Sequence, residues 1–279
     1  MTMAYAEVVG DPVAHSKSPL IHRYWLQQLA LAGDYRARLV PRGTLRSYLA
    51  ERRPDRDWSG CSVTIPHKEA AAALVDELDA KARSAGAINC IYRRPDGLAG
   101  TNTDIDGVAA ALEGVALEGS KAVIIGGGGA ARAAIAYLAR RKVEEIVLLV
   151  RSPDKAASLS LIAPGAQLAI ADLGEAARLL DGSAAVINAS PLGMTGCPEM
   201  PPELLAAVAR HASGRALFDM VYDPVLTPFL AVGRDVGAQA IDGLTMLLGQ
   251  AAGAFELFFG TPAPAADERL RRLLVAAMK

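Results

Sequence analysis

A glycine-rich turn between a predicted strand and a predicted helix constrains the fold of this chain more than any other feature. Residues 122–132 read AVIIGGGGAAR, so Gly126, Gly128 and Ala131 fit the pattern G-x-G-x-x-G/A. The first glycine permits a tight turn, the second lets the backbone approach a pyrophosphate, and the small third residue lets helix and strand pack closely. The helix N-terminus adds free N–H groups and a partial positive charge. The alternative is a loop that only turns the chain, but its place between strand and helix favours dinucleotide binding.

The residues after the next predicted strand indicate which dinucleotide binds. An NAD site usually carries Asp or Glu at the end of this strand, to hold the ribose 2′-hydroxyl. Here the strand ends at Val150 and is followed by Arg151, with Lys155 four residues later. Two cations suit a 2′-phosphate, which an arginine can bind through two hydrogen bonds. The sequence therefore favours NADP over NAD, although Arg151 could also be an ordinary solvated side chain. Ser152 and Pro153 suit the N-cap and first position of the following helix.

Short strand-like runs alternate with helical patterns along most of the chain. This alternation of strands and helices predicts an α/β fold with mostly parallel sheets and helices on both faces. The rhythm restarts at Lys121, so we expect a domain boundary within residues 104–120. Pro95–Gly97 reads PDG and predicts a hairpin turn. The chain ends in two predicted helices, 244–259 and 266–278. The predicted strands are 6–10, 35–40, 61–65, 87–92, 122–126, 146–150, 167–170, 184–188 and 216–219.

Composition excludes several classes of protein. At about 150 residues per domain, a chain of 279 residues is expected to form two domains. The 29 basic and 30 acidic residues nearly cancel, and aromatic residues make up only 5%, which argues against nucleic-acid binding. No apolar run reaches the roughly 18 residues of a membrane helix, and no secretory signal is visible. Three scattered cysteines and four histidines without ligand spacing predict no metal site and a reducing, cytoplasmic location.

Two polar segments follow predicted strands in the first third of the chain. Residues 15–19 read HSKSP and place Ser16 and Ser18 at the carboxyl edge of a strand, where open α/β sheets bind ligands. Ser18 could instead serve only as the N-cap of a helix that begins at Pro19. Residues 63–68 read VTIPHK, with Thr64 near a strand end and Lys68 at a helix start. The helix dipole disfavours a lysine there, and such local conflicts often mark functional sites, although a solvated lysine is an equally good interpretation.

Two further polar residues could lie near Lys68. Asn89 is expected inside the strand 87–92, between apolar neighbours, and Asp104 starts a predicted helix. Asp104 could be a simple helix cap. Alternatively, it could face Lys68 across a cleft and hold and orient its ammonium group.

Taken together, eight segments resemble the shikimate dehydrogenase family in order and spacing, nearly from end to end. They are HSKSP, VTIPHK, GAINC, TNTDIDG, GGGGAAR, NASPLGM, DMVYDPVLTPFL and DGLTMLLGQAAGAF. The resemblance implies an NADP-dependent oxidoreductase of aromatic amino-acid and chorismate biosynthesis, which reversibly reduces 3-dehydroshikimate to shikimate. It also implies a cytoplasmic monomer or homodimer without nucleic-acid or membrane partners. The implied fold is an N-terminal α/β substrate domain, residues 1–106 completed by helices 243–279, and a Rossmann-type NADP domain, residues 107–242, with the active-site cleft between them.

The resemblance also assigns roles to single residues. Lys68 would be the catalytic acid/base, with Asp104 beside it. The residues implied to bind the substrate are Ser16, Ser18, Thr64, Lys68, Asn89, Asp104, Tyr222 and Gln250. Those implied to bind the cofactor are Gly126, Gly127, Gly128, Gly129 and Ala130 at the pyrophosphate, Arg151, Ser152 and Lys155 at the 2′-phosphate, and Met220 and Gly243 at the nicotinamide.

The chain departs from the family pattern at three positions. Val150 replaces the asparagine that usually precedes the arginine, so one polar contact near the adenosine is lost. Gly127 replaces the alanine of the usual GAGGA turn, and Asp106 stands where a small residue is usual. Two other functions stay open: an NAD-using quinate/shikimate dehydrogenase paralogue, and a non-catalytic dinucleotide-binding sensor of the same fold. The absence of an acidic residue at Arg151 argues against the first, and the presence of Lys68, Asp104 and Gln250 argues against the second.

Overall fold

The computed structural model of the chain describes residues 3–163 and 165–278. The chain forms two compact units. The first unit comprises Met1–Asp106 and Leu248–Lys279, and the second comprises Gly107–Leu247. The chain passes from one unit to the other within α5 (Asp104–Ala111) and returns within α11 (Gly243–Phe259). In the described part of the chain, no helix combines the length and the apolar character that a membrane span requires.

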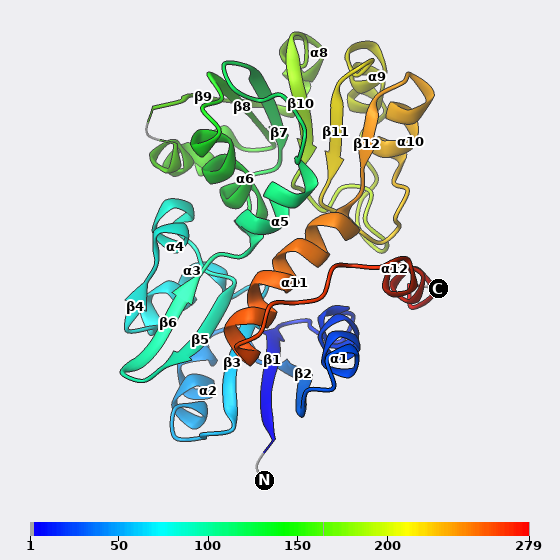
Figure 1. Cartoon of the computed structure of the whole chain (residues 1–279). Helices are drawn as coiled ribbons and strands as arrows, with labels where there is room; N and C mark the ends of the chain where they lie inside the picture. Colours follow the sequence, from blue (N-terminus) through cyan, green and yellow to red (C-terminus); the bar gives the residue numbers. More distant parts are fainter. Residues whose placement is uncertain (1–2, 164, 279) are drawn as a thin grey trace. The chain divides into compact units, whose positions relative to one another are not determined.

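The first unit is built on a mixed six-stranded sheet with the order β2-β1-β3-β5-β6-β4 (Figure 1). Strand β1 pairs in parallel with β2 and β3, whereas β5 pairs antiparallel with β3 and β6. Its strands are β1 (Ala4–Gly10), β2 (Gly33–Leu39), β3 (Trp58–Val63), β4 (Glu77–Leu78), β5 (Cys90–Arg94) and β6 (Gly97–Thr101). Its helices are α1 (Ser18–Gln28), α2 (Leu45–Arg52), α3 (Lys68–Ala71), η1 (Ala72–Leu74), α4 (Ala80–Ala85), α12 (Glu268–Ala276) and the C-terminal part of α11.

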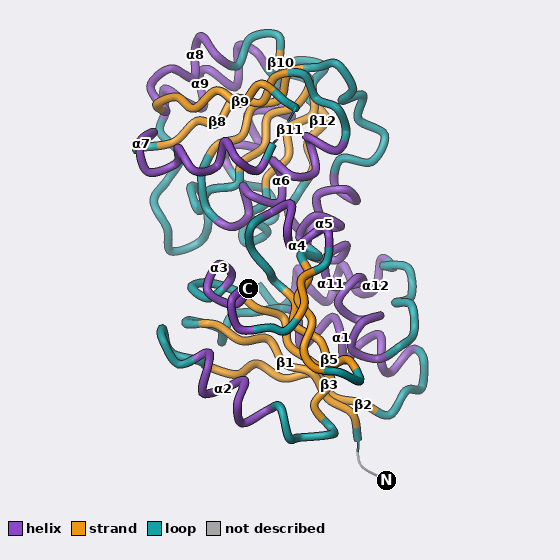
Figure 2. Tube along the Cα trace, turned by 90° about the vertical axis from the view of Figure 1, so that its left-hand side faces the viewer, coloured by secondary structure: helices purple, strands orange, loops and turns teal. Residues whose placement is uncertain are grey.

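Alternation along β1 gives this sheet two buried faces. Val9 packs with Leu45, Leu49 and other residues on the side of α2. Ala6 and Val8 pack on the opposite side with Ala254 and Phe258 of α11. Figure 2 shows α2 on one side of these strands and α1, α11 and α12 on the other. Successive side chains of a strand point to opposite faces, so one apolar strand serves both cores. The C-terminal segment therefore belongs to the hydrophobic core of the first unit.

The second unit contains an all-parallel six-stranded sheet with the order β12-β11-β10-β7-β8-β9. Its strands are β7 (Lys121–Ile125), β8 (Glu145–Val150), β9 (Gln167–Asp172), β10 (Ser183–Asn188), β11 (Ala216–Asp219) and β12 (Gln239–Ile241). Its helices are α6 (Gly129–Arg140), α7 (Pro153–Ala156), η2 (Ala157–Ile162), η3 (Leu173–Glu175), α8 (Ala176–Leu179), α9 (Pro202–His211) and α10 (Pro228–Asp235).

The strand order of the second unit is that of a Rossmann fold. Counted from β7, the chain first moves to β8 and β9 and then returns past β7 to β10, β11 and β12. Right-handed crossovers therefore place helices on both faces, and the order reverses between β7 and β10. Helices α8, α9 and α10 contribute to one buried cluster with Val123 and Ile125 of β7. Open sheets of this kind bind ligands at the carboxyl edge where the order reverses.

The predicted fold class, two α/β domains of which one is Rossmann-like, is confirmed, and the PDG turn does join two antiparallel strands. Two local predictions are wrong. The strand predicted at 87–92 begins only at Cys90, so Asn89 precedes it. Helix α1 begins at Ser18 with Lys17 as its N-cap, so Ser18 is not the cap. The short strands β4 and β12 were not predicted from the sequence.

Candidate active site

Lys68 and Asp104 form an ion pair in the first unit. The Nζ atom of Lys68 donates to Oδ2 of Asp104 over 2.5 Å. Lys68 is the first residue of α3 and Asp104 is the first residue of α5, so the fold brings together two helix starts that are far apart in the sequence. The two side chains are 18% and 7% exposed. Solvent or a ligand can therefore reach the ammonium group more easily than the carboxylate.

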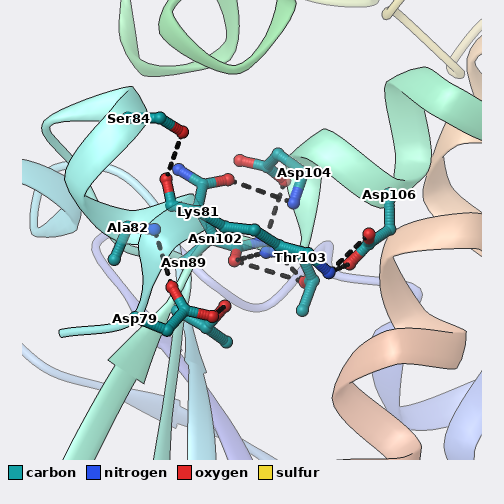
Figure 3. A network of polar contacts seen from close by, with 10 residues as sticks. Asp79, Lys81, Ala82, Ser84, Asn89, Asn102, Thr103, Asp104 and Asp106 are labelled. Atoms are coloured by element: carbon teal, nitrogen blue, oxygen red, sulfur yellow. Dashed lines mark hydrogen bonds and ion pairs between the residues drawn. The ribbon is translucent and has the colours of Figure 1, made fainter. Parts of the chain in front are cut away.

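Asn89 fixes the second oxygen of the Asp104 carboxylate. Its Nδ2 group donates to Asp104 Oδ1 over 2.9 Å, and its Oδ1 atom accepts from the backbone N–H of Thr103 over 2.7 Å (Figure 3). The Thr103 hydroxyl lies 3.0 Å from Asn89 Nδ2 as well. Both oxygens of Asp104 are thus occupied, which restricts the carboxylate to one orientation toward Lys68. Thr103 was not predicted to belong to the site, and its position directly before Asp104 was the only signal in the sequence.

The hydroxyl-bearing residues Ser16, Ser18 and Thr64 follow two neighbouring strands of the same sheet. Thr64 comes directly after β3, and its backbone N–H donates to the carbonyl of Val9 on β1 over 2.9 Å. The backbone N–H of Ser18 donates to Ser16 Oγ over 3.3 Å. Strands β1 and β3 are parallel neighbours, so residues that follow them lie at one edge of the sheet. Gly10 permits the close approach, because a Cβ atom there would lie 2.3 Å from Thr64 Cγ2.

Gln250 lies on α11, in the part of that helix that belongs to the first unit. Gly253 follows it by one turn on the same helix face. A Cβ atom on Gly253 would lie 3.1 Å from Oδ2 of Asp106 and 3.3 Å from Cγ2 of Thr103. The glycine therefore lets α11 approach the segment that carries Asp104, and this face of α11 also carries Gln250.

The glycine-rich turn of the second unit joins β7 to α6. Gly126 has a φ of +109°, and a Cβ atom there would lie 2.9 Å from the backbone N of Ser190. Gly128 is the N-cap of α6, and Gly129 and Ala130 form its first turn. A Cβ atom on Gly128 would have no neighbour within 4 Å, so the backbone there is open. An anion could therefore reach the N–H groups at the start of this twelve-residue helix.

Arg151, Ser152 and Lys155 lie after β8, beside the glycine-rich turn in the sheet order. All three side chains are exposed, and Ser152 occupies the N-cap of α7. Within residues 3–163 and 165–278, neither Arg151 nor Lys155 forms a salt bridge. The two cations are therefore available to an anionic ligand.

Met220, Tyr222 and Gly243 lie near the end of β11 and at the start of α11. The backbone N–H of Met220 donates to the carbonyl of Asn188 over 2.9 Å. A Cβ atom on Gly243 would lie 2.7 Å from the Met220 carbonyl oxygen and 2.5 Å from that of Val221. Burial raises the pKa of Tyr222 above its ordinary value. Tyr222 belongs to the second unit, unlike the other residues implied to bind the substrate.

No group of three His, Cys, Asp or Glu side chains in the described ranges is arranged to hold a metal ion. The first unit offers an oriented ammonium group and several neutral hydrogen-bonding side chains, and the second unit offers a glycine-rich turn with an open backbone at the start of α6.

Three sequence families match the chain. Residues 8–91 match the family described as "Shikimate dehydrogenase substrate binding domain", residues 108–193 match "Shikimate / quinate 5-dehydrogenase", and residues 243–267 match "Shikimate 5'-dehydrogenase C-terminal domain". A shikimate dehydrogenase (NADP(+)) from Sphingopyxis alaskensis is 46% identical over 98% of this chain and 97% of its own length. The chain belongs to the shikimate dehydrogenase family.

Other relatives agree with this assignment. A shikimate dehydrogenase (NADP(+)) from Afipia carboxidovorans is 39% identical over 96% of this chain and 95% of its own. The crystal structure of shikimate 5-dehydrogenase from Thermus thermophilus, in complex with NADP(H) and shikimate, is 32% identical. It superimposes with a TM-score of 0.82 over 99% of this chain and 100% of its own. The family assignment from the eight sequence motifs is thereby confirmed, and with it the class of oxidoreductases that act on a CH–OH group.

Proposed function

We propose that the protein is an NADP-dependent shikimate dehydrogenase, which reduces 3-dehydroshikimate reversibly to shikimate. The observation that carries the proposal is the Lys68–Asp104 ion pair, held by Asn89 in the unit that matches the family's substrate-binding domain. Accordingly, the first unit binds the substrate and carries the catalytic groups, and the second unit binds the cofactor.

The substrate is a small carboxylate with several hydroxyl groups, and the proposed binding residues suit it. Ser16, Ser18, Thr64, Asn89 and Gln250 offer neutral donors and acceptors. From the second unit, Tyr222 adds a phenolic hydroxyl. Sites of this kind reject analogues that lack a hydroxyl group, because a buried polar side chain is then left without its partner.

Lys68 acts as the general acid in the direction of reduction. Negative charge grows on the ketone oxygen as the carbonyl carbon is reduced, and the ammonium group stabilises this charge and then transfers its proton to the oxygen. Asp104 orients the ammonium group through its Oδ2 atom. In the direction of oxidation the neutral amine removes the hydroxyl proton, and exchange with water restores the starting state.

The second unit fits NADP. The open backbone at Gly128 and the N-terminus of α6 suit a pyrophosphate, and the exposed Arg151 and Lys155 suit the 2′-phosphate with help from Ser152. Gly127, Gly129 and Ala130 complete the turn, and Met220 and Gly243 flank the nicotinamide. When bound, the cofactor supplies the hydride.

A spectrophotometric assay tests the proposal directly. Purified protein is given shikimate or quinate, each with NADP+ or NAD+, and the absorbance of the reduced nicotinamide is followed. We expect kcat/KM to be highest for shikimate with NADP+. Cofactor binding without turnover of either acid would overturn the proposal and favour a non-catalytic sensor. A higher kcat/KM for quinate with NAD+ would favour a quinate/shikimate paralogue.

The proposal also covers the oligomeric state of the protein and its location in the cell. We propose a monomer or homodimer, which light scattering coupled to size-exclusion chromatography distinguishes. A cytoplasmic location is supported by the free thiols of Cys61, Cys90 and Cys197, since free cysteines are typical of reducing compartments.

A further inference from the structure

A carboxylate is fully buried at the carboxyl end of β11 in the second unit. Asp219 is 0% exposed and forms no salt bridge within the described residues. Burial raises the pKa of this carboxyl from 3.8 to about 6, and the hydrogen bonds that it accepts from Thr227, Val221 and Asn188 act in the opposite direction. A buried charge without a counter-ion is costly, and the hydrogen bonds that Asp219 accepts offset part of this cost.

The three donors to Asp219 come from three different segments. Asn188 Nδ2 donates to Asp219 Oδ1 over 2.9 Å, and the backbone N–H of Val221 donates to the same oxygen over 2.9 Å. The hydroxyl of Thr227 donates to Oδ2 over 2.6 Å. Thr227 also caps α10 through Leu230. Each donor is itself buried or belongs to a buried backbone.

Asn188 extends this network into the loop after β10. It is the partner of Asp219 in the register of β10 and β11. Its Nδ2 group also donates to the Leu192 carbonyl over 3.1 Å, and its Oδ1 atom accepts from the backbone N–H and the hydroxyl of Ser190. The Asn188–Asp219 pair therefore holds the loop 189–192 and the segment 220–222 against one another.

Both held segments touch residues that the proposed function assigns to the cofactor. The backbone of Ser190 lies against Gly126 of the glycine-rich turn, and the carbonyl oxygens of Met220 and Val221 lie against Gly243. Arg151 and Lys155, which are proposed to bind the adenosine half, follow β8 on the other side of β7. The network thus borders the proposed nicotinamide end of the site and not its adenosine end.

We infer that Asp219 is a positioning residue, which holds the loop 189–192 and the segment 220–222 in the conformation that binds the nicotinamide half of the cofactor. The inference rests on the proposed function for the identity of that cofactor. A carboxylate suits this task because it is an acceptor only, whereas an asparagine would turn an N–H group toward Thr227.

A positioning role for Asp219 can be distinguished from a general loss of structure by comparing the binding of two ligands, one with and one without the nicotinamide half. Calorimetry measures the Kd of NADP+ and of adenosine 2′,5′-bisphosphate, which contains the adenosine half and the 2′-phosphate but no nicotinamide. For Asp219→Ala we expect the Kd of NADP+ to rise about tenfold, in line with the loss of charged hydrogen bonds, while the Kd of the bisphosphate stays within about twofold. Asp219→Asn keeps the shape of the side chain and is expected to give a smaller rise.

Control variants at Asp181 and Thr227 and the turnover of the wild-type protein are measured as well. Asp181→Ala, at the other end of β10, is expected to change neither Kd. Thr227→Val is expected to weaken NADP+ binding, and Thr227→Ser, which keeps the donor, to restore it. An equal change for both ligands, or no change for either, would overturn the inference. A wild-type protein that binds NADP+ but does not turn over shikimate would refute the proposed function and leave this comparison intact.

Discussion

In the second unit, the backbone of Gly127 lies against the side chain of Val150. A Cβ atom on Gly127 would lie 3.1 Å from Cγ1 of Val150, and the backbone of Gly127 is outside the left-handed region. These are two of the positions where the chain departs from the family pattern, which has alanine and asparagine there. An alanine at position 127 would therefore contact Val150 tightly, and the valine would have to shift by a few tenths of an ångström to accommodate it.

A double-mutant cycle measures this link. Gly127→Ala alone should lower the free energy of unfolding by about 1 kcal/mol, because overpacking of a tight contact is destabilising. In a Val150→Ala background the same change should be neutral or stabilise by about 0.5 kcal/mol, because alanine restricts the unfolded chain. Urea denaturation gives both values. Equal effects in the two backgrounds would show that the residues act independently.

Replacement of Lys68 tests the proposed proton transfer. Lys68→Ala should lower kcat by about 10²- to 10⁴-fold, the usual contribution of general acid–base catalysis, with a smaller change in KM. Lys81→Ala is the matched control, because Lys81 also lies in the first turn of a helix and pairs with an aspartate, Asp106, at 2.6 Å. Steady-state kinetics with shikimate and NADP+ should show little effect of this control. Unchanged turnover of Lys68→Ala would remove the lysine from the mechanism.

The cofactor preference depends on Arg151 in our proposal. Arg151→Ala should lower the ratio of kcat/KM for NADP+ to that for NAD+ by about 10- to 100-fold, because a charge-assisted contact to the 2′-phosphate is lost. Lys142→Ala removes an exposed cation that pairs with Glu118 near the opposite end of the sheet, and it should leave the ratio unchanged. If the ratio for Arg151→Ala equals that of the wild type, another residue holds the 2′-phosphate.

Local sequence patterns predicted the parts of the site that depend on local structure. The turn at Gly126 and Gly128 was recognisable by its glycine spacing between a strand and a helix, and Lys68 because it conflicts with the dipole of its own helix. The contact between Lys68 and Asp104 could be proposed from the sequence only as an alternative to a helix cap at Asp104, because the two residues are 36 positions apart.

Features that depend on tertiary contacts could not be predicted in this way. The apolar neighbours of Asn89 suggest that it lies inside a strand. In the structure its side chain forms hydrogen bonds with Thr103 and Asp104, and the regular strand starts one residue later. The role of Asp219 was not predicted either. Its three donors come from residues 188, 221 and 227, and no spacing in the sequence indicates that they converge.

His22 gives a prediction about stability. It is fully buried, its ring stacks on Tyr35 at a centroid distance of 3.9 Å, and neither of its ring nitrogens has a hydrogen-bond partner among the described residues. Burial lowers the pKa of its imidazole from 6.5 to about 3. The unfolded chain therefore binds a proton on this residue between pH 6.5 and 3, whereas the folded chain does not. Folding stability must fall as the pH falls through this window.

His22→Phe removes this proton-linked effect and keeps an aromatic ring in the cluster. Between pH 6.5 and 4, the wild type should lose about 3 kcal/mol more unfolding free energy than the variant, as expected for a group that is charged only in the unfolded chain. Urea denaturation at several pH values gives the difference curve, which contains only the contribution of this residue. A flat curve for His22→Phe would mean that the folded protein accommodates the imidazolium ion.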